Sequence, residues 1–228
     1  QARAELARYE RENLPSALVD WLRSESSKLD TVTPWQRLVG QVTSTDKSEF
    51  ELQADGAYLA KGDAPNNDTV TLRATLENTT VRMLRLEALT HDSLPKKGPG
   101  RANNGNFALG NIECKIIDSK QQSSPSIKLT AARASYQQNS DSLSVAASID
   151  DDPVSGWAVD GQIGQDQAAV FSLEQPLEID APSELQVTLS FQHPNPKHAI
   201  GRFRLSVSSQ VELEPSIGDV GPSPSVSA

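Results

Sequence analysis

Apolar and polar residues alternate along several short segments of this chain, and that alternation limits its possible folds more than any other feature. Successive side chains of a β-strand point to opposite faces of a sheet, so an alternating segment predicts a strand with one buried face. No apolar pattern of helical period separates these segments, which argues against an α/β fold. The sequence therefore predicts an all-β protein of about ten strands, an antiparallel β-sandwich of the jelly-roll type. The clearest alternating segments are residues 70–76, 107–109, 112–116, 187–191 and 203–207.

Three parts are expected along the 228 residues. Residues 1–33 have a helical pattern, with alternating Glu and Arg and then an apolar face, and they predict a short N-terminal helical segment. Residues 34–211 contain the alternating segments and are expected to form the β-sandwich module. Residues 212–228 are rich in Pro and Gly and are expected to be a linker or tail. Because the chain starts inside a helical pattern, we interpret it as a fragment of a larger protein.

The formal net charge is −9 at pH 7, and the acidic residues are concentrated between residues 134 and 196. That stretch holds ten Asp or Glu residues and neither Lys nor Arg. Nucleic-acid binding needs a basic surface that neutralises phosphates, so no nucleic-acid partner is expected. No apolar run approaches the roughly 20 residues that cross a bilayer, so no membrane insertion is expected.

Sequence motifs of catalysis are missing. The chain has no nucleophile elbow, no phosphate-binding loop and no helical zinc motif, so we expect that it is not an enzyme. The single cysteine, Cys114, lies in an alternating segment and is expected to be a buried small hydrophobe. His193 and His198 lie five residues apart in a loop with Pro and Asn, and with His91 they are expected on the surface or packed in loops.

Four longer stretches resemble a known module. They are RLEAL at residues 85–89, GPGRANNGNFALGNIE at 98–113, SIDDDPVSGWAVDGQIGQDQAAVFSLEQPL at 148–177 and HAIGRFRLSVSS at 198–209. Together they resemble a module of large planctomycete surface proteins, which lies between two planctomycete-specific domains of unknown function and accompanies cytochrome-c-like domains. The resemblance covers about residues 35–209 and implies a bacterial, extracytoplasmic parent whose neighbouring domains are partners of this module. It implies no haem here, because the chain has no Cys-x-x-Cys-His motif.

Residues 149–157 also resemble the signature of the discoidin fold, which is Ile-Asp-Gly-Asp followed after two residues by Thr-x-Trp. Asp151 replaces the usual Gly of that signature, and Ser155 replaces the usual Thr. The resemblance implies a galactose-binding-like sandwich with carbohydrate-binding relatives, although other relatives bind other partners. Fold alone does not fix function.

The same loop is the best candidate for a metal site. Calcium takes six to eight oxygen ligands from carboxylates and carbonyls, and in discoidin-like relatives this loop often holds structural calcium. We expect a calcium site at Asp150, Asp152 and Ser155. The alternative is an Asx-rich turn whose carboxylates accept hydrogen bonds from nearby backbone N–H groups.

A glycine-rich loop at residues 98–106 carries polar groups suited to a polyhydroxylated ligand. Arginine offers a planar fork of donors, and asparagine offers both donors and acceptors. These groups can instead tie the loop down, and Trp157 can either stack on a sugar or belong to the core. The candidate ligand-binding residues are Arg101, Asn103, Asn104, Asn106, Trp157, His198 and Arg202. The sequence thus predicts a non-catalytic carbohydrate-binding module whose partner is a glycan or cell-surface polysaccharide. The alternative is a structural spacer with no ligand.

Overall fold

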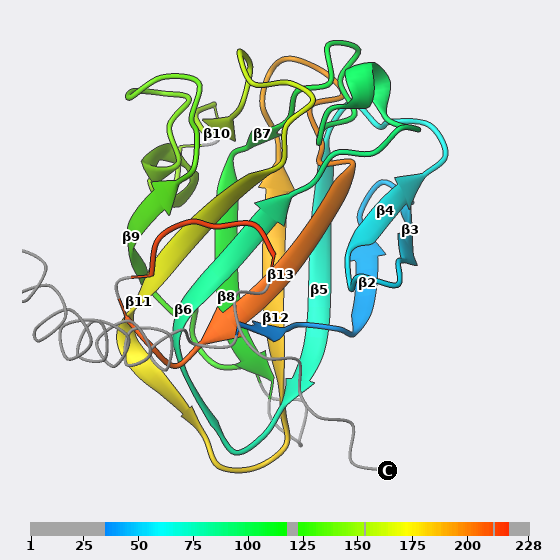
Figure 1. The fold of residues 1–228 in the computed structure, drawn as a ribbon. Coiled ribbons are helices and arrows are strands. Elements are labelled where there is room, and N and C mark those ends of the chain that lie inside the picture. The colour runs from blue at the N-terminus through cyan, green and yellow to red at the C-terminus, as the bar shows by residue number, and fades with distance from the viewer. Residues whose placement is uncertain (1–34, 118–122, 153, 212, 219–228) are drawn as a thin grey trace, which may run out of the picture. The chain divides into compact units, whose positions relative to one another are not determined.

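Two antiparallel β-sheets pack against each other in the part of the chain that the computed structural model describes (Figure 1). The described residues are 35–117, 123–152, 154–211 and 213–218, and they lie in one unit bounded by Trp35 and Gly218. The predicted N-terminal helical segment, residues 1–33, lies outside them. The prediction of an all-β, antiparallel sandwich is confirmed.

The larger sheet has the strand order β3-β4-β13-β6-β11-β9, with β1 also beside β13, and the smaller sheet has the order β2-β5-β12-β8. A third, two-stranded pair joins β7 to β10. Every pairing between these strands is antiparallel. The strands are β1 Gln36–Arg37, β2 Gln41–Ser44, β3 Glu49–Leu52, β4 Tyr58–Lys61, β5 Asp68–Leu76, β6 Thr79–Ala88, β7 Ala108–Leu109, β8 Asn111–Ile117, β9 Leu129–Ala134, β10 Trp157–Ala158, β11 Gln167–Ile179, β12 Ser183–Phe191 and β13 Arg202–Ser208, and two 3-10 helices are η1 Pro95–Lys97 and η2 Ala146–Ile149.

The core lies between the two sheets and is built from rows of apolar side chains that cross the strands. On the smaller sheet, Val187 is paired with Leu72 on one side and with Cys114 on the other. On the larger sheet, Leu86 is paired with Leu205. All of these side chains are buried in one cluster. Each fully buried leucine or valine contributes about 1.5–3 kcal/mol through removal of apolar surface from water.

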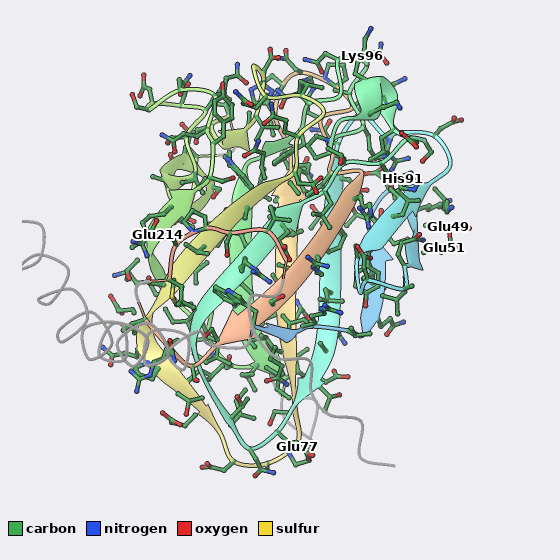
Figure 2. All side chains as sticks on the ribbon, viewed as in Figure 1. Glu49, Glu51, Glu77, His91, Lys96 and Glu214 are labelled. Carbon is green, nitrogen blue, oxygen red and sulfur yellow. The ribbon has the colours of Figure 1, made fainter. Side chains whose placement is uncertain are left out.

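Charged side chains protect the outer strands. β3 is an edge strand, and its Glu49 and Glu51 project outward (Figure 2), while Phe50 between them packs edge-on against Phe203 at 5.6 Å between ring centroids. Charges on an edge strand oppose pairing with the edge of another molecule.

Among the described residues, no helix has the length and apolar character needed to cross a membrane.

The segment of residues 213–218 lies on the outer face of the larger sheet, where it crosses the strands in Figure 1. Arg85 Nη1 donates to the carbonyls of Ser216 at 3.2 Å and of Gly218 at 2.8 Å. These bonds connect β6 to residues of the stretch 212–228 that the sequence predicted as a linker or tail.

Candidate ligand-binding site

β7 and β10 lie at one end of the sandwich (Figure 1). Residues of both strands line a recess of about 110 Å³, which we call the loop recess. Its floor consists of backbone segments side by side. Ala158 of β10 pairs with Ala108 of β7. Gln138 N–H donates to the Ala158 carbonyl, and Ala108 N–H donates to the His198 carbonyl, both at 2.9 Å. The alanines in the middle are short whereas Gln138 and His198 on either side are long, so the hollow lies over the alanines.

The glycine-rich loop of residues 98–106 forms one wall of the loop recess. Gly100 N–H donates to the Gly105 carbonyl at 3.0 Å, and a Cβ atom on Gly100 would lie 1.9 Å from the Asn106 carbonyl oxygen. No other residue fits at such a distance, so glycine is required there. The close approach fixes the position of Asn106 above the floor.

Asn106 is itself held by hydrogen bonds that orient its side-chain amide. Its Oδ1 accepts from Val159 N–H at 3.0 Å, and its Nδ2 donates to Gln138 Oε1 at 3.4 Å. Because an amide oxygen only accepts and an amide nitrogen only donates, these bonds leave Gln138 Nε2 as an available donor. Asn104 Oδ1 accepts from Asn106 N–H at 3.1 Å, which likewise leaves Asn104 Nδ2 as a donor.

Two histidines that line the loop recess are fixed in opposite tautomers. His193 Nδ1 accepts from Asn195 N–H at 3.1 Å, so in the neutral ring the proton lies on Nε2. His198 Nδ1 lies 2.9 Å from the Pro196 carbonyl, which can only accept, so in the neutral ring Nδ1 carries the proton and Nε2 accepts. The ring centroids are 5.9 Å apart. The pair therefore presents one donor and one acceptor to a ligand.

The charges around the loop recess disfavour an anion. Asp160 lines it with an exposed carboxylate, and no Lys or Arg is among the described residues that line it. Burial lowers the pKa of His193, and the neighbouring His198 lowers it further, so the His193 ring is neutral near pH 7. The loop recess therefore combines neutral donors and acceptors with one negative charge.

Three of the seven ligand-binding residues expected from the sequence line the loop recess, namely Asn104, Asn106 and His198. Asn103 is exposed beside them but does not line it. The remaining three residues, Arg101, Trp157 and Arg202, make contacts within the protein.

Arg101 ties the glycine-rich loop to a neighbouring turn. It is only 5% exposed, and its guanidinium donates to Ser48 Oγ at 2.8 Å and to the carbonyls of Lys61 at 3.3 Å and Gly62 at 2.9 Å. Burial lowers its pKa, whereas Asp68 and Asp63 act in the opposite direction. Arg101 therefore ties the loop down, which was the alternative to ligand binding in the sequence analysis.

Trp157 and Arg202 are held in a similar way. The Trp157 ring is fully buried, packs edge-on against Phe107 at 5.1 Å between centroids, and donates from Nε1 to the Tyr136 carbonyl at 2.9 Å. Its ring therefore has no face open to a sugar. Arg202 donates to the Thr90 carbonyl at 3.0 Å and forms an ion pair with Asp55 at 2.6 Å.

The loop expected to hold calcium surrounds the Ser155 hydroxyl with oxygen atoms. Ser155 Oγ lies 3.0 Å from both carboxylate oxygens of Asp150, 3.1 Å from the Asp152 carbonyl and 3.3 Å from the Ala147 carbonyl. Asp150 Oδ1 also accepts from Asp152 N–H at 2.9 Å, which is an Asx turn. The oxygens suit a hard cation in their chemistry, and water would have to supply the rest of the six to eight ligands that calcium takes.

No protein-family model matches this chain, and no curated protein matches it either. Within the described ranges, no group of three or more His, Cys, Asp or Glu side chains is arranged to hold a metal ion. The loop recess and its hydrogen-bonding groups are therefore the strongest basis for a function.

Several residues of the loop recess were not identified from the sequence as ligand-binding. Gln138, Asp160 and Asn195 carry no motif, and His193 was expected on the surface or packed in a loop. The pairing of β7 with β10 brings the first two beside Asn106, and each of those strands has only two residues. The one available signal was the density of amide and imidazole side chains in residues 193–198.

Proposed function

We propose that this chain is a non-catalytic carbohydrate-binding module of a larger bacterial protein, and that the loop recess takes the edge of one uncharged sugar. The observation that carries the proposal is the His193–His198 pair, which offers a donor beside an acceptor. Neighbouring sugar hydroxyls each donate and accept, so they can satisfy both rings at once. Gln138, Asn104 and Asp160 supply further donors and an acceptor at the same place.

The proposal includes the setting of the module. The resemblance of residues 148–177 and 198–209 to the planctomycete module supports a periplasmic or cell-surface location and contacts with neighbouring domains of a parent chain. The discoidin-like signature at residues 149–157 supports a galactose-binding-like sandwich and a structural calcium ion at Asp150, Asp152 and Ser155. A cell-surface polysaccharide is the partner that fits this setting.

A structural spacer with no ligand of its own is the second candidate, and one observation favours it. The Trp157 ring is fully buried and Trp35 is 8% exposed, with the Arg85 guanidinium 4.6 Å from the Trp35 ring centroid. Neither tryptophan offers the exposed flat surface on which many sugar-binding sites rely. A ligand of the loop recess would therefore be held without stacking on either of these tryptophans.

An array of uncharged and charged glycans, probed with the full 228-residue chain in the presence of calcium, separates the two candidates. We expect retention of an uncharged glycan and a loss of roughly tenfold or more in affinity for Gln138→Ala and for His198→Ala, since each removes a hydrogen-bonding partner of a desolvated ligand. Gln175→Ala is the matched control, because Gln175 is exposed on β11 away from the loop recess. Failure of the folded chain to retain any glycan would favour the spacer.

A further inference from the structure

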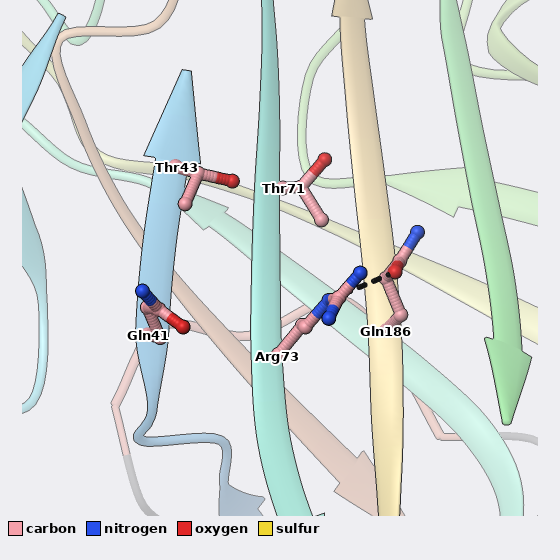
Figure 3. Close-up of a pocket in the computed structure, with 5 residues that line it drawn as sticks. All are labelled: Gln41, Thr43, Thr71, Arg73 and Gln186. Atoms are coloured by element: carbon pink, nitrogen blue, oxygen red, sulfur yellow. Dashed lines mark hydrogen bonds between the residues drawn. The ribbon is translucent and has the colours of Figure 1, made fainter. Parts of the chain in front are cut away.

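The smaller sheet carries a second, larger recess on its outer face, formed by polar side chains of three adjacent strands. This sheet recess has a volume of about 320 Å³ and is lined by Gln41, Thr43, Thr71, Arg73 and Gln186 (Figure 3). The apolar residues of the same strands point the other way into the core, as with Leu72 and Val187. The sheet recess shares no lining residue with the loop recess.

Register places the polar side chains in rows across the sheet. Arg73 of β5 is paired with Gln41 of β2 and with Gln186 of β12, and Gln186 is paired in turn with Lys115 of β8. Adjacent strands lie about 4.8 Å apart, so the side chains of one row stand next to one another. This row contains two cations, two amides and no carboxylate.

The Arg73 guanidinium is positioned by one partner only. Its Nε donates to Gln186 Oε1 at 3.0 Å, and within the part of the chain that the structure describes it forms no ion pair. Gln186 is 8% exposed, so it is a buried support for the arginine. Arg73 itself is exposed, which leaves both Nη groups to a ligand.

A chain of hydrogen bonds connects Arg73 to a threonine hydroxyl of the sheet recess. Because Arg73 only donates, Gln186 must present Oε1 to it and turn Nε2 to Thr188 Oγ1, at 3.4 Å. Thr188 Oγ1 lies 3.4 Å from Thr71 Oγ1, and either hydroxyl can donate in that bond. The sheet recess is thus lined by the donors of Arg73 and by the Thr71 hydroxyl.

We propose that the sheet recess is a second ligand site, which binds an oxyanion-bearing sugar of an acidic polysaccharide. A planar guanidinium pairs with two oxygens of a carboxylate or sulfate at once, and such bonds are about twice as strong as neutral ones. Gln41 and Thr43 on β2 provide adaptable groups for the sugar hydroxyls beside the oxyanion. The site and the charge of its ligand both differ from those proposed for the loop recess, so this inference goes beyond the proposed function.

Nearby carboxylates determine the side from which the oxyanion approaches. Glu113 of β8 is paired with Thr188, and Glu184 lies two residues along β12 from Gln186. Both lie on the β8 side of Arg73, and like charges repel. The oxyanion must therefore reach Arg73 from the β2 side, where the described lining residues carry no negative charge.

The test measures binding of three oligosaccharides to the full chain by titration calorimetry. One carries uronate carboxylates, one carries sulfate esters, and one is the uncharged parent of the first. We expect the uronate or the sulfated sugar to bind and the uncharged parent to bind at least tenfold more weakly. Whichever of the uronate and the sulfated sugar binds more tightly shows whether the preferred oxyanion is a carboxylate or a sulfate. Equal affinity for all three sugars, or no binding of any, would overturn the proposal.

Variants then assign the binding to the sheet recess. Arg73→Gln is expected to lower the affinity for the acidic sugar by roughly tenfold to a hundredfold, since it removes a charge-assisted pair. Arg133→Gln, which makes the same charge change at an exposed arginine on β9, should leave the affinity unchanged, as should His198→Ala in the loop recess. An Arg73→Gln protein that stays folded by circular dichroism and binds as tightly as the wild type would sink the assignment.

Discussion

Arg204 and Glu87 face each other across β13 and β6 in a two-point ion pair. Arg204 Nε lies 2.6 Å from Glu87 Oε2, and Nη2 lies 2.8 Å from Oε1. Arg85 Nη2 lies 3.3 Å from the same carboxylate, and Gly218 N–H donates to it at 2.7 Å. Glu87 is fully buried, so one carboxylate joins two cations and the segment of residues 213–218 on the outer face of the larger sheet.

Replacing this carboxylate by an amide is expected to be strongly destabilising. Glu87→Gln keeps the shape of the side chain but leaves two buried cations, Arg85 and Arg204, without the negative charge between them. Removal of one partner from a buried pair costs about 3–5 kcal/mol. Urea unfolding followed by circular dichroism should show a lower midpoint at an unchanged slope.

Glu51→Gln provides the comparison for that variant. Glu51 pairs with Lys61 at the surface, and both side chains are about half exposed. Water screens an exposed pair, so its loss should hardly move the midpoint. Equal effects of the two substitutions would show that the buried cluster adds nothing beyond a surface pair.

Cys114 is expected to be inert in the folded protein. Burial, and then the nearby Glu113, raise the pKa of the Cys114 thiol to about 12. Near pH 8 only about one thiol in ten thousand would then be ionised, compared with roughly a quarter for a free cysteine. Iodoacetamide should therefore label the chain in urea but not in buffer.

Ser209→Cys is the control for accessibility of the reagent, because Ser209 is exposed just after β13. That variant should be labelled once in buffer and twice in urea. Rapid labelling of native Cys114 would instead reveal local opening of β8, which lies at the edge of the smaller sheet and is paired with β12.

Alternation in the sequence was enough to predict strands that have one exposed face and one buried face. The segment of residues 70–76 lies in β5, and 187–191 lies in β12. β6 did not show the pattern clearly, because Met83 shares its outer face with Arg85 and Glu87. Met83 packs there against Trp35 and Val170, so an apolar residue interrupts the alternation.

Periodicity in the sequence could not predict the short strands or the irregular ones. β10 has two residues, too few to show a period, and β7 covers only two residues of the alternating segment 107–109. β11 contains a register shift between Ser172 and Leu177, which puts its two halves out of phase. Since the β7–β10 pairing assembles the loop recess, its residues could be predicted only within the glycine-rich loop and at His198.

Calcium is expected to stabilise the protein through the loop at Asp150, Asp152 and Ser155. An ion present at ten times its dissociation constant would stabilise the folded state by about 1.4 kcal/mol, and extracellular modules bind calcium near about 1 mM. The melting temperature should rise with calcium in the wild type and in Asp151→Asn, whose residue 151 is exposed with a φ of 63° that Asn tolerates. It should not rise in Asp150→Asn. If calcium does not change the melting temperature of the wild type, Asp150 acts only as an acceptor in the Asx turn.

Acidification is expected to weaken both stability and sugar binding through His193. Its pKa lies below the ordinary value of about 6.5, so between the two values the unfolded chain holds a proton that the folded chain does not. The contribution of the neutral ring is therefore complete above about pH 6.5 and is lost as the pH falls through that window. Protonation also removes the Nδ1 acceptor used by Asn195 and puts a charge beside His198. Melting temperature and glycan affinity measured from about pH 8 to pH 5 should both fall less steeply in His193→Asn than in the wild type, and parallel curves would show that the ring does not titrate in the loop recess.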